Sequence, residues 1–208
     1  LRFVRSIVET EINSVTDNPI IFPDDDSVIS AGNFHGQPIA IALDLLGLAL
    51  AEACTFSERR IDKLLSGLNP KLPLFLTTDA GLSSGMMVLQ YTAAALISKN
   101  SILATPAGLG SASVSAGQED HASMGVTSAL KAREIIEIAT KVVAIELICA
   151  SQAVDLLGVE NLGTGTSRAV KQVRKITKHL DKDRSLSDDL DRLSKYLSKD
   201  EFTKIMMD

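Results

Sequence analysis

The stretch "SAGQEDHASMG" at residues 115–125 gathers residue types that could carry chemistry. Gln118, Glu119, Asp120 and His121 stand side by side in a chain of 208 residues that has only three histidines. Carboxylates next to an imidazole can act as general acid and base, and the same groups can hold a metal ion. They also suit the start of a helix, where acidic side chains face the positive end of the helix dipole. All three interpretations are open from this stretch alone.

A second loop, "GNFHG" at residues 32–36, has the same character. Its glycines flank Phe34 and His35, and glycine beside a reactive side chain permits close approach of another group. A tight turn with Phe34 in the hydrophobic core explains the pattern equally well. A metal site built from the histidines and carboxylates of the two loops lacks the HExxH or CxxC spacing typical of such sites. The chain has no GxSxG elbow, P-loop or Rossmann glycine pattern, so hydrolase, phosphotransferase and dinucleotide-binding functions have no motif behind them.

The composition is that of a globular chain with a small or neutral partner. It is 45% hydrophobic, and its 21 Lys and Arg against 26 Asp and Glu give a net charge of -5. This acidic balance argues against nucleic acid or an anionic membrane as partners. Cys54 and Cys149 lie within apolar helical patterns, so we expect buried thiols and a reducing, cytoplasmic setting. The longest apolar run, residues 38–53, is shorter than the roughly 20 residues of a membrane span and carries Asp44 and Glu52, which favours a core helix.

The elements that must position these loops are mostly helices. Apolar residues recur at three- and four-residue intervals across residues 1–15, which predicts an amphipathic helix that ends before Pro19. The segments "IIF" and "SVIS" on either side of "PDDD" predict a small β-hairpin. A long apolar helix is predicted from Pro38 through "SERRIDKLL", and a third helix at residues 86–104.

The second half of the chain is also predicted to be helical. A loop rich in Gly, Ala and Ser leads into a helix from about His121 to Leu157, which ends at Gly158. Two shorter amphipathic helices follow, at residues 168–180 and 187–198. In the second of them Ser187 is the predicted N-cap, and three leucines share one face, namely Leu190, Leu193 and Leu197.

The predicted fold class is an all-α bundle of long helices with a minor β-hairpin. We expect residues 1–158 to form the central bundle helices with the site loops, and residues 159–208 to form the short C-terminal helices. The unusually apolar helices need cover from further helices, supplied by missing chain or by other subunits. Because the sequence opens in mid-pattern without an initiator Met, we expect it to be a piece of something longer.

Several motifs, taken together and in order, resemble a known enzyme family. They are "ETEINSVTDNPIIF", "GNFHGQPIAIALD", "SERRID", "LPLFLT", "GLSSGMM", "QYTAAAL" and "GQEDHASMG". Over residues 1 to about 197 the sequence resembles the aromatic amino acid ammonia-lyases, most closely their histidine-specific branch, the histidine ammonia-lyases. The resemblance implies the helical fold of ammonia-lyases and fumarase-like lyases, although the fumarase signature "GSSxMPxKxN" is only partly echoed by "GLSSGMM".

The resemblance also implies a reaction, the non-oxidative elimination of ammonia from L-histidine to give trans-urocanate in histidine breakdown. The family uses 4-methylideneimidazol-5-one (MIO), an electrophile formed from an Ala-Ser-Gly tripeptide of its own backbone. This sequence contains no Ala-Ser-Gly, and the family's upstream stretch with substrate-binding tyrosine and arginine is expected before Leu1. We therefore expect the C-terminal part of a cytoplasmic, homotetrameric, metal-free enzyme, inactive without its N-terminal part.

The resemblance assigns residues to the site. Phe34 matches the family's phenylalanine beside the methylidene ring, and Glu119 matches the carboxylate of histidine-specific members that faces the polar groups of the substrate. Polar residues of the same motifs are expected to bind substrate or to support these two: Asn18, Asn33, His35 and Gln118. His121 is expected in the first turn of its helix as a structural residue, so that residues 118–121 form a helix N-terminus and a wall of the site at once.

Alternatives to this assignment stay open. Lys99 stands where relatives commonly have an acid, and Thr105 where they have a histidine, which leaves the substrate preference open. Tyrosine ammonia-lyases share the "NFHG" and "QEDH" motifs, and a related aminomutase is a further alternative within the family. From a different class of protein, the chain could be a catalytically inert helical assembly domain.

Overall fold

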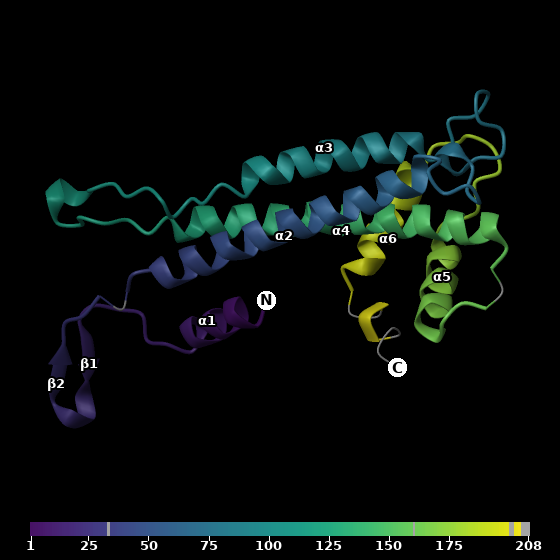
Figure 1. Cartoon of the computed structure of the whole chain (residues 1–208). Coiled ribbons are helices and arrows are strands. Elements are labelled where there is room, and N and C mark those ends of the chain that lie inside the picture. The colour runs from purple at the N-terminus through teal and green to yellow at the C-terminus, as the bar shows by residue number, and fades with distance from the viewer. Residues whose placement is uncertain (33, 160, 200–201, 205–208) are drawn as a thin grey trace. The chain divides into compact units, whose positions relative to one another are not determined.

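The structure is a computed structural model of a mostly helical chain (Figure 1). It describes residues 1–32, 34–159, 161–199 and 202–204. The predicted all-α class with a minor β-hairpin is confirmed. The chain divides into two compact units, of which the first comprises Leu1–Leu50 and Ser101–Ile136 and the second comprises Ala51–Asn100 and Glu137–Asp208.

The first unit opens with a helix and the predicted hairpin. Its elements are helix α1 (Arg2–Ile12), strand β1 (Ile20–Phe22), the 3-10 turn η1 (Pro23–Asp25) and strand β2 (Ser27–Ile29). The strands pair antiparallel, with Ile20 opposite Ile29. Asp26 closes the turn with a left-handed φ of 46°, a conformation that aspartate tolerates better than most residues. The hairpin is therefore confirmed where the sequence placed it.

Two long helices, α2 (Gln37–Leu65) and α4 (Gly125–Leu157), contribute their N-terminal parts to the first unit. The predicted start of α4 near His121 is wrong, because the preceding loop closes on itself. Val114 and Glu119 pair through two backbone hydrogen bonds of 2.8 and 3.2 Å, and Met124 then takes a left-handed φ of 56°. The first turn of α4 has no acidic residue, so the predicted helix N-terminus at residues 118–121 is also wrong.

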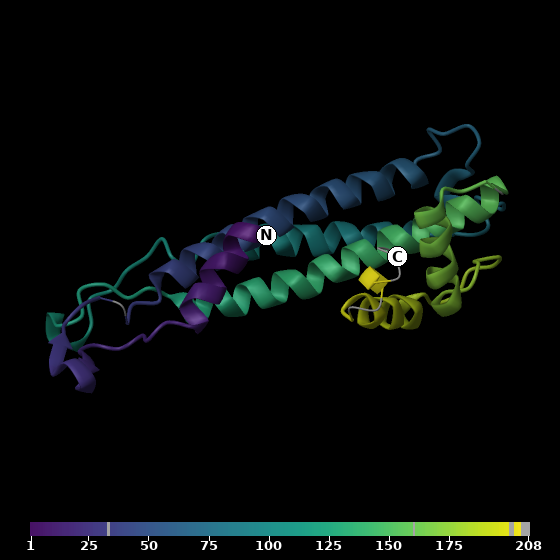
Figure 2. The same cartoon turned by 90° about the horizontal axis from the view of Figure 1, so that it is seen from below.

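The second unit holds the main hydrophobic core. Its elements are the remainder of α2 and α4, the 3-10 turn η2 (Leu74–Leu76), most of α3 (Met87–Leu103), α5 (Thr164–Ile176) and α6 (Ser187–Leu197). Within this unit α2, α3 and α4 run side by side in both views (Figure 1 and Figure 2). The largest fully buried hydrophobic side chains of this core are Ile61, Leu65, Leu76, Met86, Ile145, Ile148, Val173 and Leu193. Cys149 lies in this core and Cys54 is also buried, which confirms the prediction of buried thiols.

The two short helices depart from the prediction at their starts. Helix α5 runs from Thr164 to Ile176, so it begins before the predicted start at residue 168 and ends before the predicted end at residue 180. Ser187 is the first residue of α6 rather than its N-cap; Leu186 holds the cap position, and no side chain caps the helix. The Ser187 hydroxyl instead lies 2.8 Å from that of Ser185. The leucine face is confirmed, since Leu190 and Leu193 are buried and Leu197 packs against the core.

Helix α2 is the one described helix that is long and apolar enough to cross a membrane, by length and composition alone. It has 29 residues, more than the predicted run at residues 38–53, and 22% of its most apolar window is buried within this chain. A core helix meets the same two criteria, so they do not separate the two cases. Ile41, Leu45 and Leu48 are exposed along it, and their cover by further helices stays a prediction.

Candidate active site

The two loops singled out in the sequence meet in the first unit around a cavity of about 300 Å³. The residues that line it come from both loops: Phe34, His35, Gly36, Val114, Glu119, His121, Ala122 and Ser123. The structure therefore brings together Phe34 and Glu119, the two residues predicted to form the centre of the site.

The loops approach closely because glycine stands at two points of contact. A Cβ atom at Gly36 would lie 3.2 Å from Ser123 Oγ, and one at Gly125 would lie 3.3 Å from the carbonyl oxygen of Gly36. Both distances are shorter than ordinary van der Waals contact, so a side chain at either position would need its neighbour to move by a few tenths of an ångström. Glycine favours the close approach of the loops by its lack of a side chain rather than by an unusual φ angle.

Phe34 presents an apolar ring at the wall of the cavity. Its exposed fraction is 42%, and its ring centroid lies 5.7 Å from that of His35. The alternative that Phe34 belongs to the hydrophobic core is wrong for this chain, since core residues of the same unit such as Ala40 are fully buried. A partly exposed aromatic ring beside polar groups is typical of a small-molecule site.

Glu119 reaches the cavity from a strained turn. Ser115 and Ala116 have left-handed φ angles of 54° and 56°, and Gly117 follows with 88°. Such conformations are costly for residues other than glycine and cluster at functional sites. Glu119 is half-buried, and its carboxylate has no hydrogen-bond or ion-pair partner among the described residues. It is a partly desolvated carboxylate that is free to bind a ligand.

Both histidines of the loops make hydrogen bonds that cross between segments. His35 Nε2 lies 2.8 Å from the carbonyl oxygen of His121, and His121 Nε2 lies 3.0 Å from Oε1 of Gln37. Sequence reasoning missed Gln37, the first residue of α2. The signal that could have found it is its position inside the "GNFHGQP" motif, directly after Gly36.

Asp44, also missed by sequence reasoning, holds the loop that follows α3. Its carboxylate accepts hydrogen bonds from the backbone N–H groups of Ala107 at 3.1 Å and Gly108 at 2.8 Å. Lys131 lies 3.8 Å from the same carboxylate and also donates to the carbonyl of Thr105. The sequence signal that could have found Asp44 is a carboxylate within an otherwise apolar helix, because a carboxylate buried in such a helix requires hydrogen-bond donors.

The metal alternative finds no support in the described part of the chain. No group of three or more His, Cys, Asp or Glu side chains is placed there to hold a metal ion. The rings of His35 and His121 lie close together, with centroids 4.9 Å apart and planes tilted by 34°, and the Nε2 atom of each is occupied by a hydrogen bond.

Comparison with known proteins settles the family. The sequence profile described as "Aromatic amino acid lyase" matches residues 1–175. The chain belongs to the aromatic amino acid lyase family. Members of this family depend on MIO, which is the electrophile that the sequence resemblance implied.

The relatives of this lyase chain include ammonia-lyases and aminomutases. A histidine ammonia-lyase of Symbiobacterium thermophilum is 47% identical over 201 residues, which are 97% of this chain and 40% of the relative. The crystal structure of histidine ammonia-lyase from Trypanosoma cruzi superimposes with a TM-score of 0.93 at 40% identity, over 98% of this chain and 40% of that one. Tyrosine aminomutase from Streptomyces globisporus gives 0.94 at 34% identity, over 99% and 39%. The chain thus spans about two fifths of the length of these relatives.

Two other predicted site residues of the lyase chain, Asn18 and Gln118, are not among the described residues that line the cavity. Asn18 Oδ1 accepts hydrogen bonds from Ser30 Oγ and the backbone N–H of Ala31, both at 3.1 Å, and so closes the base of the hairpin. Gln118 is exposed, and its backbone N–H donates to the carbonyl of Ser115. Asn33 lies outside the described residues. Asn18 therefore stabilises the hairpin, and its contribution to the site stays a prediction.

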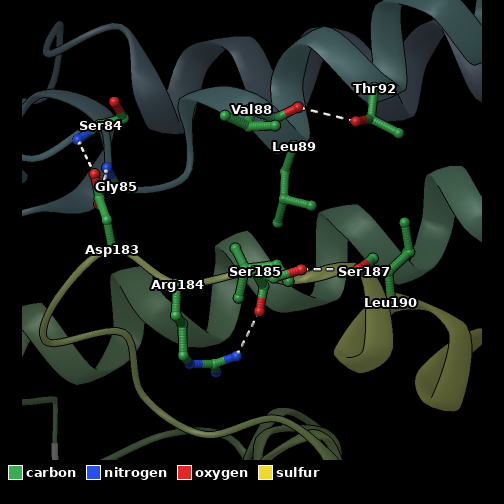
Figure 3. Close-up of a pocket in the computed structure, with 11 residues that line it drawn as sticks. Ser84, Gly85, Val88, Leu89, Thr92, Asp183, Arg184, Ser185, Ser187 and Leu190 are labelled. Carbon is green, nitrogen blue, oxygen red and sulfur yellow. Dashed lines mark hydrogen bonds between the residues drawn. The ribbon is translucent and has the colours of Figure 1, made fainter.

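A second cavity, of about 560 Å³, lies in the second unit of the lyase chain (Figure 3). Asp183 there accepts hydrogen bonds from the backbone N–H groups of Ser84 at 2.7 Å and Gly85 at 2.9 Å. Arg184 pairs with Asp189 at 2.6 Å. Among the described residues that line this cavity, the one carboxylate and the one guanidinium are thus both engaged in holding the segment ahead of α6. The first cavity, with its unpaired carboxylate, is the better candidate for chemistry.

Proposed function

We propose that this chain supplies part of the active site of a histidine ammonia-lyase, which eliminates ammonia from L-histidine and releases trans-urocanate. The observation that carries the proposal is the meeting of Phe34 and Glu119 at one cavity. The identity of 47% to a relative named histidine ammonia-lyase, over 97% of this chain, supports the choice of histidine as substrate.

Glu119 is assigned to the polar groups of the substrate. L-Histidine carries N–H donors on its ammonium group and on its imidazole, and a carboxylate accepts charge-assisted hydrogen bonds from either. Because the Glu119 carboxylate has no partner among the described residues, binding a substrate breaks no bond that these residues make. Phe34 provides an apolar wall against which the side chain of the substrate can pack.

The elimination removes a proton from the β-carbon and ammonia from the α-carbon, and the electrons of the C–H bond form the new carbon–carbon double bond. The β-proton is weakly acidic and the amine is a poor leaving group, so a base and an electrophile are both needed. The MIO group supplies the electrophile when it is present. The residues described here fit such a group, since the partly exposed ring of Phe34 offers an apolar face beside which it would be held. Its Ala-Ser-Gly precursor would come from outside these 208 residues.

The rest of the active site would also come from outside this chain. We infer that the N-terminal part of the same enzyme and further copies in a homotetramer complete it in the cytoplasm, and that the isolated chain is inactive. The share of the relative's length that this chain spans, 40%, is consistent with that division.

An assay of the complete protein that contains this chain tests the proposal. L-Histidine and L-tyrosine are supplied separately at equal concentration, and the ultraviolet absorbance of urocanate and the release of ammonia are followed. We expect urocanate and ammonia in equal amounts from L-histidine. Coumarate or β-tyrosine from L-tyrosine, without urocanate from L-histidine, would support the tyrosine lyase or the aminomutase instead. Conversion of neither substrate would support an inert assembly domain.

A further inference from the structure

The side chain of His35 joins the two loops of the cavity. Its Nε2 atom lies 2.8 Å from the carbonyl oxygen of His121, across 86 residues of sequence. A carbonyl oxygen only accepts hydrogen bonds, so Nε2 of His35 carries the proton in this contact. His35 directly follows Phe34, and His121 is separated from Glu119 by a single residue. The bond therefore connects the two positions assigned to the site.

The same histidine that accepts this bond is itself held by α2. His121 Nε2 lies 3.0 Å from Oε1 of Gln37, so its ring donates to the first residue of that helix. The two imidazole rings stack, with their centroids 4.9 Å apart and their planes tilted by 34°. The loop that carries Glu119 is thus tied by one bond to the loop that carries Phe34 and by a second bond to the first residue of α2.

Both contacts require a hydrogen on Nε2 of the histidine ring, because the carbonyl oxygen of His121 and Oε1 of Gln37 accept hydrogen bonds. The Nδ1 atom of His35 is shielded from solvent and has no partner among the described residues. A hydrogen on Nδ1 of His35 would find no acceptor among the described residues. The surroundings of His35 therefore suit a structural bond through Nε2 rather than proton transfer.

We propose that His35 is a positioning residue, which sets Phe34 and Glu119 at the correct separation through its Nε2–H bond to the His121 carbonyl. Two close contacts of the loops support this assignment, because Gly36 and Gly125 allow an approach that the hydrogen bond then fixes. The inference rests on the proposed function for its effect on rate, whereas the bond itself is independent of the substrate. Misplacement of a catalytic group by about 1 Å can reduce a rate by about 100-fold.

Two substitutions of similar size distinguish the effect of losing the Nε2–H hydrogen bond from the effect of losing the imidazole ring. A glutamine side chain can place its amide N–H close to the position of Nε2, whereas the shorter asparagine reaches only the position of Nδ1. In the complete protein we expect His35→Gln to retain kcat for L-histidine within about fivefold of wild type. We expect His35→Asn to lower kcat by about 50-fold and to change KM by less than about threefold.

A double variant tests whether His35 acts through Glu119. If His35 positions that carboxylate, His35→Asn should cost less than about fivefold once Glu119→Gln has already removed the charge, because positioning and function belong to one unit. A residue that only stabilises the fold would give the same factor in both backgrounds. Equal kcat values for His35→Gln and His35→Asn would overturn the proposal.

Hydrogen exchange of the backbone amides of residues 118–124 in the complete protein gives a readout that needs no turnover. We expect faster exchange in His35→Asn and wild-type exchange in His35→Gln. If the wild-type protein does not convert L-histidine, the proposed function fails. The exchange rates still show whether the bond from His35 to His121 holds the two loops together. If exchange is the same in both variants, the bond does not hold the loops and the positioning role is wrong, whatever the substrate.

Discussion

Gln152 and Glu119 are polar side chains with opposite surroundings. In the second unit Gln152 is fully buried. Its Oε1 accepts hydrogen bonds from the backbone N–H of Leu180 at 3.1 Å and from Arg174 at 3.2 Å, and its Nε2 donates to the Leu180 carbonyl at 3.0 Å. In the first unit Glu119 is half-buried, and none of the described residues bonds its carboxylate.

The difference separates a group that holds the fold from one that is available to a ligand. Burial of a polar group is tolerated when its hydrogen bonds are made within the protein, as they are at Gln152. A half-buried carboxylate without an internal partner contributes little to stability and is a candidate for binding or catalysis. The two residues should therefore respond to substitution in opposite ways, one in rate and the other in stability.

The largest effect is expected on activity, from Glu119→Gln in the complete protein. The change removes the charge that faces the substrate, so we expect kcat for L-histidine to fall by about 100-fold to 1,000-fold. Stability should change by less than about 0.5 kcal/mol, because no described internal bond is lost. Steady-state kinetics and urea unfolding measure the two quantities.

Asp120→Asn is the matched control for that variant. It makes the same change of charge at the adjacent, exposed residue, and we expect less than a threefold loss of kcat. Equal losses in Glu119→Gln and Asp120→Asn would show that the net charge of the loop matters and that Glu119 has no individual role.

The second effect is expected on stability, from Gln152→Ala. The substitution leaves the N–H and carbonyl of Leu180 without their buried partner, and we expect a loss of about 3 kcal/mol in the free energy of unfolding. Gln152→Glu loses the donor and places a carboxylate oxygen against the Leu180 carbonyl in the core, so a loss at least as large as that of Gln152→Ala is expected. Circular dichroism during urea unfolding measures both. The activity of the folded fraction should stay at the wild-type level, and a fall in kcat as large as that of Glu119→Gln would remove the contrast between the two residues.

The smallest effect is expected from the thiol of Cys149. Complete burial, with a further contribution from the charge of Glu146, raises the pKa of Cys149 from 9.0 to about 12. At pH 8 only about one part in ten thousand of this thiol is ionised, so iodoacetamide should leave it unmodified in the native protein and should alkylate it in urea. Because the unfolded thiol ionises first, its contribution to stability is present below pH 9 and is lost as the pH rises toward 12. Mass spectrometry after alkylation checks this expectation, and rapid labelling at pH 8 in the native state would contradict it.

Much of the fold follows from local patterns in the sequence. The periodicity of apolar residues and the prolines correctly predicted α2, α3 and the leucine face of α6, and turn residues predicted the hairpin between Ile20 and Ile29. Errors arose at helix starts. The start of α4 was misplaced because acidic residues normally favour a first turn, whereas here the backbone pairing of Val114 with Glu119 fixes a loop instead.

The candidate site was harder to predict from the sequence, because it depends on contacts between distant segments. Neither loop contains a pattern that shows it meets the other, since the bond from His35 to His121 spans 86 residues. The pairing of Phe34 with Glu119 came from the resemblance to a family. Gln37 and Asp44 were missed because their roles depend on which backbone groups the fold brings to them.

Helices α2 and α4 each begin in the first unit and end in the second. Within the first unit, Gln37 holds His121 from the first residue of α2, where backbone N–H groups have no partner in the preceding turn. Helix ends are the parts of a helix that open most easily, so a substitution that destabilises the first turn of α2 would also release His121. Such a substitution can act as a loss-of-function allele without contacting any ligand.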